Sequence, residues 1–465
     1  MDYTISEETA IFNAGHEAHD HMHMLFSKRK KQAILALLSS FAFMHLTIAQ
    51  ATRLCMPAVA SDLNTQPSLM GHSIGLWLFA ACLGGLTGGV YSTFSGRRPV
   101  QLVGASLMCF GSISTGLSTS VPVYMVSRAI EGLGAGSGAY IGPAVIGDIY
   151  QLEKRGSALG VLRSVTFIGM ILILPIGGLV TAYASWRTLQ FCLGIMSGVI
   201  FILMFLYFPE TSHPSMRGID QTPPSNRPSR FMIINPLKPL VLLRSPNVLA
   251  ISFIVFTAFL AESVLTVPLG WTLDSKFDIT NPAIISVCFV LVAIGNMFGT
   301  LLSGKTSDIV VVHYKAHRNG IWLPEDRLRT ALPATLIGVP FAVLAFGLVA
   351  EYLPGSLVGL SLCLSCLFVN GIVTEFVLSP SIAYLTDLLR EQSAEAVAAA
   401  ISLSFLLLSV SVGWIIPSIE MLGIVGVNTL VAILALGGHV VLWFTVKYGD
   451  RMRTWVDMDY SISNR

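Results

Sequence analysis

Apolar runs long enough to cross a membrane alternate with short polar segments along most of the 465 residues. A helix needs about 20 predominantly apolar residues to span the hydrocarbon layer. Six such runs precede a polar stretch and six follow it; they lie at 33–54, 71–94, 100–119, 122–150, 158–183, 188–208, 247–271, 283–304, 331–351, 355–385, 396–418 and 426–446. The pattern predicts an all-α membrane protein with twelve transmembrane helices in two six-helix halves.

The polar segments divide the chain into five expected parts. The stretch between the two sets of runs carries eight prolines and several basic residues, so it is too polar to bury and too short for a domain. We interpret it as a cytoplasmic linker. The parts are a cytoplasmic N-terminal tail at 1–32, a six-helix half at 33–208, the linker at 209–246, a second six-helix half at 247–447 and a cytoplasmic C-terminal tail at 448–465.

Composition agrees with insertion into a membrane. Hydrophobic residues make up 53% of the chain and charged residues 12%, against roughly 25% charged residues in a soluble domain. The seven cysteines lie mostly inside apolar runs, which indicates no disulfide framework. Cys363 and Cys366 form a C-x-x-C pair, which we interpret as small helix-packing residues.

The distribution of lysine and arginine among the loops predicts the orientation, because cytoplasmic loops are enriched in these residues. The outer side receives only Arg53, Arg187 and Lys276. The cytoplasmic side receives many more, including the cluster at 28–31, Arg97, Arg98, Lys154, Arg155, the linker residues, Lys305, Lys315, Arg318, Arg327, Arg329, Arg390, Lys447, Arg451 and Arg453. Both termini are therefore expected in the cytoplasm. The membrane is expected to be the plasma membrane, with a vacuolar or other endomembrane as the alternative.

The run at 122–150 contains two ions at membrane depth. Arg128 and Glu131 are three residues apart and share a helix face. Charged side chains inside a bilayer are costly and mostly paired or functional, and a snorkelling arginine would leave the glutamate unexplained. Small residues that permit close helix contact follow, together with a proline that favours a bend: Gly132, Gly134, Gly138, Gly142 and Pro143.

One motif imitates a nucleotide site. Residues 299–306 read GTLLSGKT and satisfy the phosphate-binding pattern G-x-x-x-x-G-K-[ST]. That pattern works only between a buried strand and a helix of a water-exposed α/β domain. Here it ends an apolar run of membrane length, and no polar segment is large enough for a nucleotide-binding domain. No metal cluster or catalytic triad is visible either, so we expect no enzyme activity, no cofactor, no metal and no nucleic-acid partner.

Several short motifs match a family of membrane transporters. The matching segments are RAIEGLG at 128–134, GDIYQLEKRG at 147–156, WR at 186–187, PET at 209–211, NPLKPL at 235–240, TNP at 280–282, PEDRL at 324–328 and SAE at 393–395. On these residues the chain resembles the major facilitator superfamily, and in particular the fungal twelve-span drug:proton antiporters, over about residues 33–447. The resemblance implies that Arg128 is associated with proton coupling. Glu131 departs from the family, which has glutamine there.

The resemblance also implies a cytoplasmic gate and an antiporter motif, each with a departure. The expected gate residues are Gly89, Gly96, Arg97, Arg98, Asp148, Arg155, Gly304 and Asp308. Thr93 stands where the family has an aspartate, which weakens the charge relay of the first half, whereas Asp308 keeps the acid in the second. The antiporter motif G-P-x-x-G-G survives only as Pro175, Gly177 and Gly178, with the proline displaced by one position. Export is therefore less firmly implied than transport.

These observations predict a proton-coupled secondary transporter that exports a small amphipathic metabolite, drug or organic acid by alternating access. Its expected partners are the substrate, protons and the lipid bilayer, and we expect a monomer. The candidate ions of the cavity are Arg128, Glu131, Arg163, Glu262 and Glu375. For Glu262 and Glu375, a helix-end carboxylate is the alternative. Uptake or facilitated diffusion of a small organic anion, and a transport-inactive membrane receptor, remain alternative functions.

Overall fold

A computed structural model describes residues 26–139, 141–150, 152–212, 219, 238–318, 323–388 and 393–455. In this part of the chain the regular elements are helices, with no strand. The first set is α2 (Lys28–Asp62), α3 (Pro67–Ser95), α4 (Arg97–Gly116), α5 (Val121–Ala139), α6 (Ile141–Ile149), α7 (Leu152–Tyr183) and α8 (Trp186–Tyr207). The second set is η2 (Lys238–Arg244), α10 (Pro246–Thr266), α11 (Leu269–Phe277), α12 (Pro282–His317), η3 (Pro324–Ala331), η4 (Ala334–Gly338), α13 (Val339–Tyr352), α14 (Leu357–Leu388) and α15 (Ser393–Trp455).

Nine helical segments within the described residues are long and apolar enough to cross a membrane. The longest, α15, counts as one of the nine, although Gly423, whose φ of 74° does not belong to a helix, divides it into two helices. Three shorter α-helices are not among the nine: α4, α5 and α6, of which α5 carries the buried ions Arg128 and Glu131. The all-α membrane fold is confirmed, and the count of twelve crossings stays a prediction.

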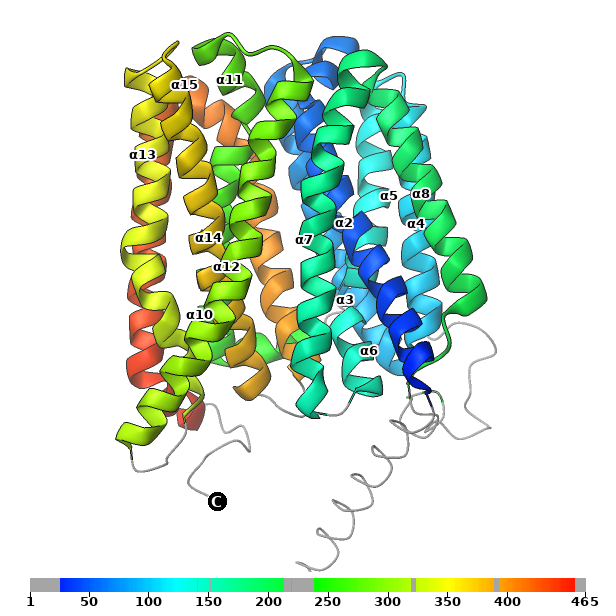
Figure 1. Ribbon diagram of the computed structural model, residues 1–465, viewed down its shortest axis with the longest axis vertical. Coiled ribbons are helices and arrows are strands. Elements are labelled where there is room, and N and C mark those ends of the chain that lie inside the picture. The colour runs from blue at the N-terminus through cyan, green and yellow to red at the C-terminus, as the bar shows by residue number, and fades with distance from the viewer. Residues whose placement is uncertain are drawn as a thin grey trace, which may run out of the picture.

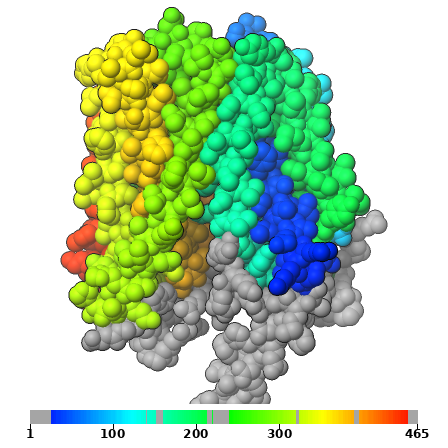
Figure 2. Space-filling view, viewed as in Figure 1, coloured from blue at the N-terminus to red at the C-terminus, as the bar shows by residue number. Residues whose placement is uncertain are grey.

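The helices form two groups that lie side by side (Figure 1). The first group, α2 to α8, runs from blue to green on the right, and the second group, α10 to α15, runs from green to red on the left. Two helix pairs form most of the boundary: α7 packs on α12, and α3 packs on α15. In the ribbon and the space-filling view, α7 and α12 touch near the top and diverge below (Figure 2).

The two ends of the bundle differ in what they carry. The start of α2, the start of α4 and the end of α15 lie at one end, the bottom of Figure 1, which we call the linker end because α8 ends and α10 begins there. The other end carries α11 and is called the α11 end. Since the described chain starts and finishes at the same end, its helices cross the bundle an even number of times.

Glycines bring pairs of helices together within each group. A Cβ added at Gly88 of α3 would lie 2.8 Å from Ser137 Cα of α5, and one added at Gly299 of α12 would lie 2.7 Å from Ile372 O of α14. Real Cβ atoms do not come so close to backbone, so only glycine permits these contacts. This packing holds the helix faces that carry the polar residues described next.

The position of Arg53 corrects the sequence analysis, which placed this residue in an outer loop. Helix α2 continues to Asp62, so Arg53 lies inside the helix, more than two turns before its end. The residues after it, LCMPAVA, are apolar and extend the helix, because Pro57 bends or weakens an α-helix without necessarily ending it. Arg53 therefore belongs to the interior of the bundle.

Candidate functional site

The Arg128–Glu131 pair lies inside the first group of helices. Both residues are on α5, with exposed fractions of 1% and 0%. Arg128 Nη1 donates to Glu131 Oε2, and the Ser112 hydroxyl of α4 donates to the other carboxylate oxygen. The guanidinium of Arg128 lies over the ring of Trp77 of α3, 5.8 Å from its centroid. Three helices of one group therefore enclose the pair.

Helix α4 covers the pair, because its backbone packs closely against α5 there. A Cβ added at Gly111 would lie 2.7 Å from Glu131 Cα, so α4 reaches the α5 backbone at this turn. A buried ion pair is costly to form and more costly to break, because one partner is then left as an unpaired buried charge. From the sequence, these two residues are predicted as cavity ions. The geometry favours a closed ion pair inside the group, and a role in proton coupling stays a prediction.

Other predicted ions meet at the boundary between the two groups. Arg163 of α7 approaches Glu375 of α14, with 3.6 Å between Nη1 and Oε2. Arg53 of α2 donates to Thr266 of α10 at 3.2 Å, and the Thr266 hydroxyl in turn donates to the backbone carbonyl of Glu262 one turn earlier. Arg53 and Glu262 also attract each other electrostatically. In both places a cation of the first group faces a carboxylate of the second group.

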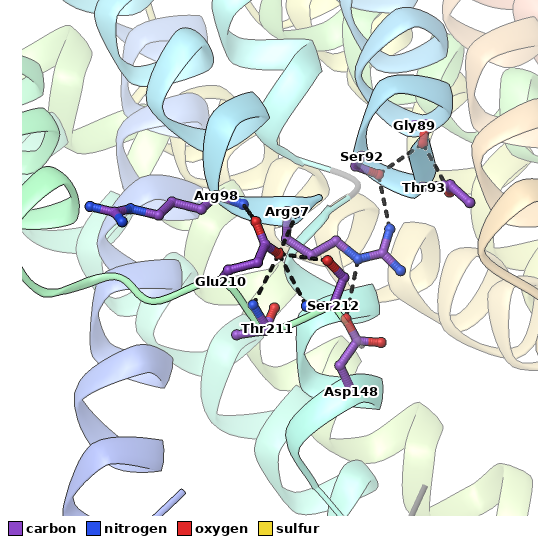
Figure 3. Close-up of polar contacts among 9 residues, drawn as sticks. All are labelled: Gly89, Ser92, Thr93, Arg97, Arg98, Asp148, Glu210, Thr211 and Ser212. Carbon is purple, nitrogen blue, oxygen red and sulfur yellow. Dashed lines mark hydrogen bonds and ion pairs between the residues drawn. The ribbon is translucent and has the colours of Figure 1, made fainter. Parts of the chain in front are cut away.

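The predicted gate residues of the first group form a polar network at the linker end (Figure 3). Arg97 Nε donates to Asp148 at 3.1 Å and Arg97 Nη1 donates to the Ser92 hydroxyl at 3.0 Å. Thr93 donates only to the carbonyl of Gly89 within its own helix, at 3.3 Å. The structure thus brings Arg97 and Asp148 together as the motif predicts, with Ser92 rather than position 93 as the neighbouring hydrogen-bond partner.

Glu210 organises the same network, although the sequence analysis noted it only as part of a family signature. Its carboxylate accepts from the backbone N–H groups of Arg97 (2.8 Å) and Arg98 (3.2 Å), the start of α4, and from the Ser212 hydroxyl (2.7 Å) (Figure 3). It thereby satisfies N–H groups that a helix start leaves without partners. Gly96, which precedes them at φ 106°, leaves room for the carboxylate.

The hydrogen bonds to Glu210 also control its protonation. Partial burial acts to raise the pKa of this carboxyl, but the hydrogen bonds from Ser212 and from the backbone of Arg97 and Arg98 outweigh it and hold the pKa below its usual range. Glu210 is therefore an anion at neutral pH. The signal that could have identified it is the Pro-Glu-Thr triplet directly after the last helix of the first group.

The second group has its own network at the linker end. Arg327 of η3 donates from Nε to Asp387 of α14 at 2.5 Å and from Nη1 to Asp308 of α12 at 3.3 Å. Asp308, the predicted gate acid, is 75% exposed at its side chain, whereas Asp387 is 25% exposed. Nearby, Arg318 binds Asp326 through two hydrogen bonds of 2.7 and 2.6 Å, which raise the pKa of Arg318. Asp326 was noted from the sequence only as part of the signature PEDRL, and Asp387 was not identified at all.

The remaining predicted residues divide into tight and open positions. An added Cβ would press on another helix at Gly132, Gly134, Gly138 and Gly178, but would meet only ordinary contacts at Gly142 and Gly177 and no atom within 4 Å at Gly89 and Gly304. Pro143 lies in α6 and Pro175 inside the continuous α7. The Arg155 side chain and residue 140, where α5 and α6 meet, are outside the described part, so the bend expected near Pro143 is untested.

Two readings of the sequence concern other kinds of site. The nucleotide-like segment 299–306 lies within helix α12, with no strand before it, and so does not form a phosphate-binding loop. Among the described residues, no group of three or more His, Cys, Asp or Glu side chains is placed to hold a metal ion.

Comparison with known proteins relates this chain to transporters. The family model described as the Major Facilitator Superfamily matches residues 34–411. The MFS antiporter QDR3 of Candida albicans is 31% identical over 37% of this chain and 25% of its own length. Two relatives match over most of their length: the MFS transporter fsa7 of a Fusarium species (25% identical, 93% of this chain, 87% of its own length) and the efflux pump radE of Floropilus chiversii (24% identical, 91% of this chain, 81% of its own length).

A solved structure has the same fold. The xylose transporter XylE from Escherichia coli, in a partially occluded inward-open conformation, superposes with a TM-score of 0.65 over 90% of this chain and 97% of its own chain. The two sequences are 15% identical, so the likeness concerns the fold alone.

Proposed function

Because the chain belongs to the major facilitator superfamily, a family of membrane transporters rather than enzymes, we propose that it is a proton-coupled exporter of a small amphipathic metabolite, drug or organic acid. It works by alternating access between its two groups of helices. The observation that carries this proposal is that the closest contacts between the groups are at one end of the bundle.

The two groups meet tightly at the α11 end. A Cβ added at Gly178 of α7 would lie 2.8 Å from Pro282 O, at the start of α12. On the other side of the molecule, Gly75 of α3 touches the backbone of Ser409 of α15, where an added Cβ would lie 3.7 Å from the Gly413 nitrogen. Toward the linker end α7 and α12 diverge (Figure 1, Figure 2). Closure at one end and divergence at the other are what one state of an alternating-access carrier requires.

The direction and the coupling rest on further observations. Relatives named as an antiporter and an efflux pump support export. The buried carboxylate of Glu375 at the boundary between the groups supports proton coupling, because a carboxylate there can exchange its arginine partner for a proton as the groups move.

The orientation follows from the charges at the two ends. Arg97, Arg98, Arg318, Arg327 and Arg451 gather at the linker end, which we assign to the cytoplasm together with both termini and the linker. Tags at residues 1 and 465 and near Ser225 should then be reached by protease only after the cells are opened. Cleavage of any of these tags in intact cells would contradict the orientation.

The function is tested with the full chain reconstituted in liposomes under an imposed pH gradient. We expect fluorescent amphipathic probes to move against their own gradient when protons flow the other way, and this movement to stop when a protonophore is added. Movement in the same direction as protons, or movement that ignores the pH gradient, would instead support uptake or facilitated diffusion. A preparation that is folded but moves no probe would support the receptor alternative. The cellular counterpart is a comparison of extracellular metabolites between a deletion strain and its parent.

A further inference from the structure

Glu375 lies on the middle of α14 where this helix packs against α12. A Cβ added at Gly299 of α12 would lie 2.8 Å from Glu375 Cβ, so the two helices hold the carboxylate in a fixed position. Glu375 is 6% exposed. A carboxylate buried in this way needs a cation, a proton or strong hydrogen bonds.

The cation that approaches Glu375 comes from the other group of helices and binds loosely. Arg163 Nη1 lies 3.6 Å from Glu375 Oε2, which is longer than a hydrogen bond, and this oxygen has no hydrogen-bond partner. The Arg163 side chain is 36% exposed. The pair is thus an electrostatic contact across the boundary, with one buried acceptor still unsatisfied.

More unsatisfied acceptors lie on the same two helices. Asn296 of α12 is 5% exposed, and its Oδ1 has no hydrogen-bond partner; this atom would lie 3.1 Å from a Cβ added at Gly371, one turn before Glu375 on α14. The hydroxyl of Thr374, next to Glu375 in the chain, is fully buried and also lacks a partner. Buried polar atoms without partners are rare in native proteins, so Glu375 Oε2 and Asn296 Oδ1, on the two packed helices, indicate a place that a polar ligand fills.

The charges around this place favour a cation. Asn296 is within hydrogen-bonding range of Glu262 of α10, and the carboxylates of Glu262 and Glu375 are close enough to repel each other. Both carboxylates belong to the second group, whereas Arg53 and Arg163, the cations that approach them, belong to the first. Carbonyl, hydroxyl and carboxylate oxygens together suit a ligand with several N–H donors and a positive charge.

We propose that Glu375 and Asn296 form a binding site for a protonated amine of the transported molecule, and that Arg163 is a tethered competitor that occupies this site from the opposite group of helices. The proposal rests on the proposed function, since it names the chemical class of substrate that the exporter takes. When an amine binds, it replaces a loose guanidinium contact with hydrogen bonds to Glu375 and to Asn296 Oδ1. The same event releases Arg163 and so removes one ionic link between the two groups.

The experiment measures equilibrium binding to the full-length protein in detergent, without any gradient. The probes are dansylcadaverine, which carries a protonated primary amine, and N-hexyl dansylamide, which has the same fluorophore and no charge. We expect the wild type to bind the amine more tightly than the neutral probe. Arg163→Gln removes the competitor and should tighten amine binding about three- to tenfold, because a ligand's apparent affinity falls by the fraction of sites already occupied. Arg163→Lys, which keeps a tethered cation, should stay near the wild type.

Glu375→Gln should weaken amine binding at least about tenfold and leave binding of the neutral probe within about twofold. Because a substitution at a buried position can impair folding, Arg163→Gln, at a partly exposed residue, provides an independent test. Equal changes for both probes, weaker amine binding by Arg163→Gln, or no amine binding by that variant would overturn the proposal. Displacement of the amine by sodium chloride, with potassium chloride as the ionic-strength control, would assign the site to a metal cation and also overturn it. Since binding is measured without transport, a protein that binds the amine selectively but transports nothing would refute the proposed function and retain the site.

Discussion

The first and the second group of helices use the same glycine contacts to bring two of their helices together. In the first group, Gly84 and Gly88 of α3 lie against the backbone of Leu133 and Ser137 in α5. In the second group, Gly295 and Gly299 of α12 lie against Phe368 and Ile372 in α14, with the same four-residue spacing on both helices. The return contacts also correspond, from Gly136 to Ala81 and from Gly371 to Val292. The two groups therefore repeat one packing arrangement.

The same register shows where the groups differ. Cys363 and Cys366 occupy in α14 the positions that Arg128 and Glu131 occupy in α5, so the C-x-x-C motif takes the place of the buried ion pair. The charges of α5 are thus neutralised inside the first group. The deep carboxylates of the second group lie at the boundary instead, where Arg53 and Arg163 of the first group reach them. We infer that the Arg128–Glu131 pair is closed, whereas the exchangeable charges are those that the two groups share at the boundary.

The largest loss of stability is expected when the buried arginine of the first group loses its counter-ion. Replacing Glu131 with Gln leaves Arg128 buried without a counter-ion and should destabilise the protein by roughly 3–5 kcal/mol. Cys366→Ser, at the corresponding position of the second group, should cost less than about 1 kcal/mol. Thermal unfolding in detergent and the amount of protein in the membrane measure both.

A double variant sharpens this test. Replacing Arg128 with Met and Glu131 with Leu together removes both charges, and the stability should return most of the way to that of the wild type. If Glu131→Gln instead reached the membrane at the wild-type level and lost only the pH dependence of transport, the pair would be a coupling site rather than a closed structural pair. Transport by this variant with unchanged pH dependence would exclude Glu131 from coupling and leave Glu262 and Glu375 as candidates.

Alanine substitutions at the glycine contacts should lower the stability by similar amounts in both groups. Gly88→Ala and Gly299→Ala each place a methyl group against the backbone of the partner helix, and overpacking of this kind costs about 1–3 kcal/mol. Gly89→Ala and Gly304→Ala are matched controls, because an added Cβ there meets no atom within 4 Å. Unfolding midpoints of the four variants provide the measurement. If Gly89→Ala lowered the unfolding midpoint as much as Gly88→Ala, close helix contact would not explain the glycine at position 88.

The gate networks at the linker end should differ in which acid matters most. Asp387→Asn removes the closer and less exposed partner of Arg327, and we expect a loss of about 1 kcal/mol in the stability of the gate. Asp308→Asn should cost less, because this side chain is 75% exposed, and Thr93→Ala least. Transport rates at equal expression should therefore fall in that order. If Thr93→Ala lowered the transport rate more than Asp308→Asn, position 93 would still take part in the charge relay of the first group.

The smallest expected effect concerns the helix start that Glu210 binds. Because the pKa of Glu210 in the folded protein lies below its ordinary value of 4.5, the carboxylate stabilises the fold above that pH and loses this contribution as the pH falls through the lowered pKa. Glu210→Gln should therefore cost about 0.5–1 kcal/mol at pH 7. The difference from the wild type should narrow as the pH falls below 4.5. Melting curves of both proteins between pH 7 and about pH 3 test this, and a gap that is constant with pH would contradict it.

Much of the architecture follows from the sequence alone. Long apolar runs must form helices in a bilayer, because backbone groups find no other hydrogen-bond partners there. The all-α membrane class and the family could therefore be predicted from runs and motifs such as RAIEGLG. The pairing of Arg97 with Asp148 also followed from motif residues, since each stands at the end of a helix on the same side of the bundle.

Only the tertiary structure decided which charges meet across the boundary between the groups and what encloses the Arg128–Glu131 pair. Arg128 and Glu131 share a helix face in any α-helix, but their enclosure by α3 and α4 depends on Gly111, which is far from them in sequence. Arg163 and Glu375, in contrast, come together only because α7 packs across the boundary near α14. The apolar runs that form membrane helices are continuous in the sequence and can be recognised there. An ion pair between distant helices depends on distances of a few ångströms, which are set by the packing of the whole bundle.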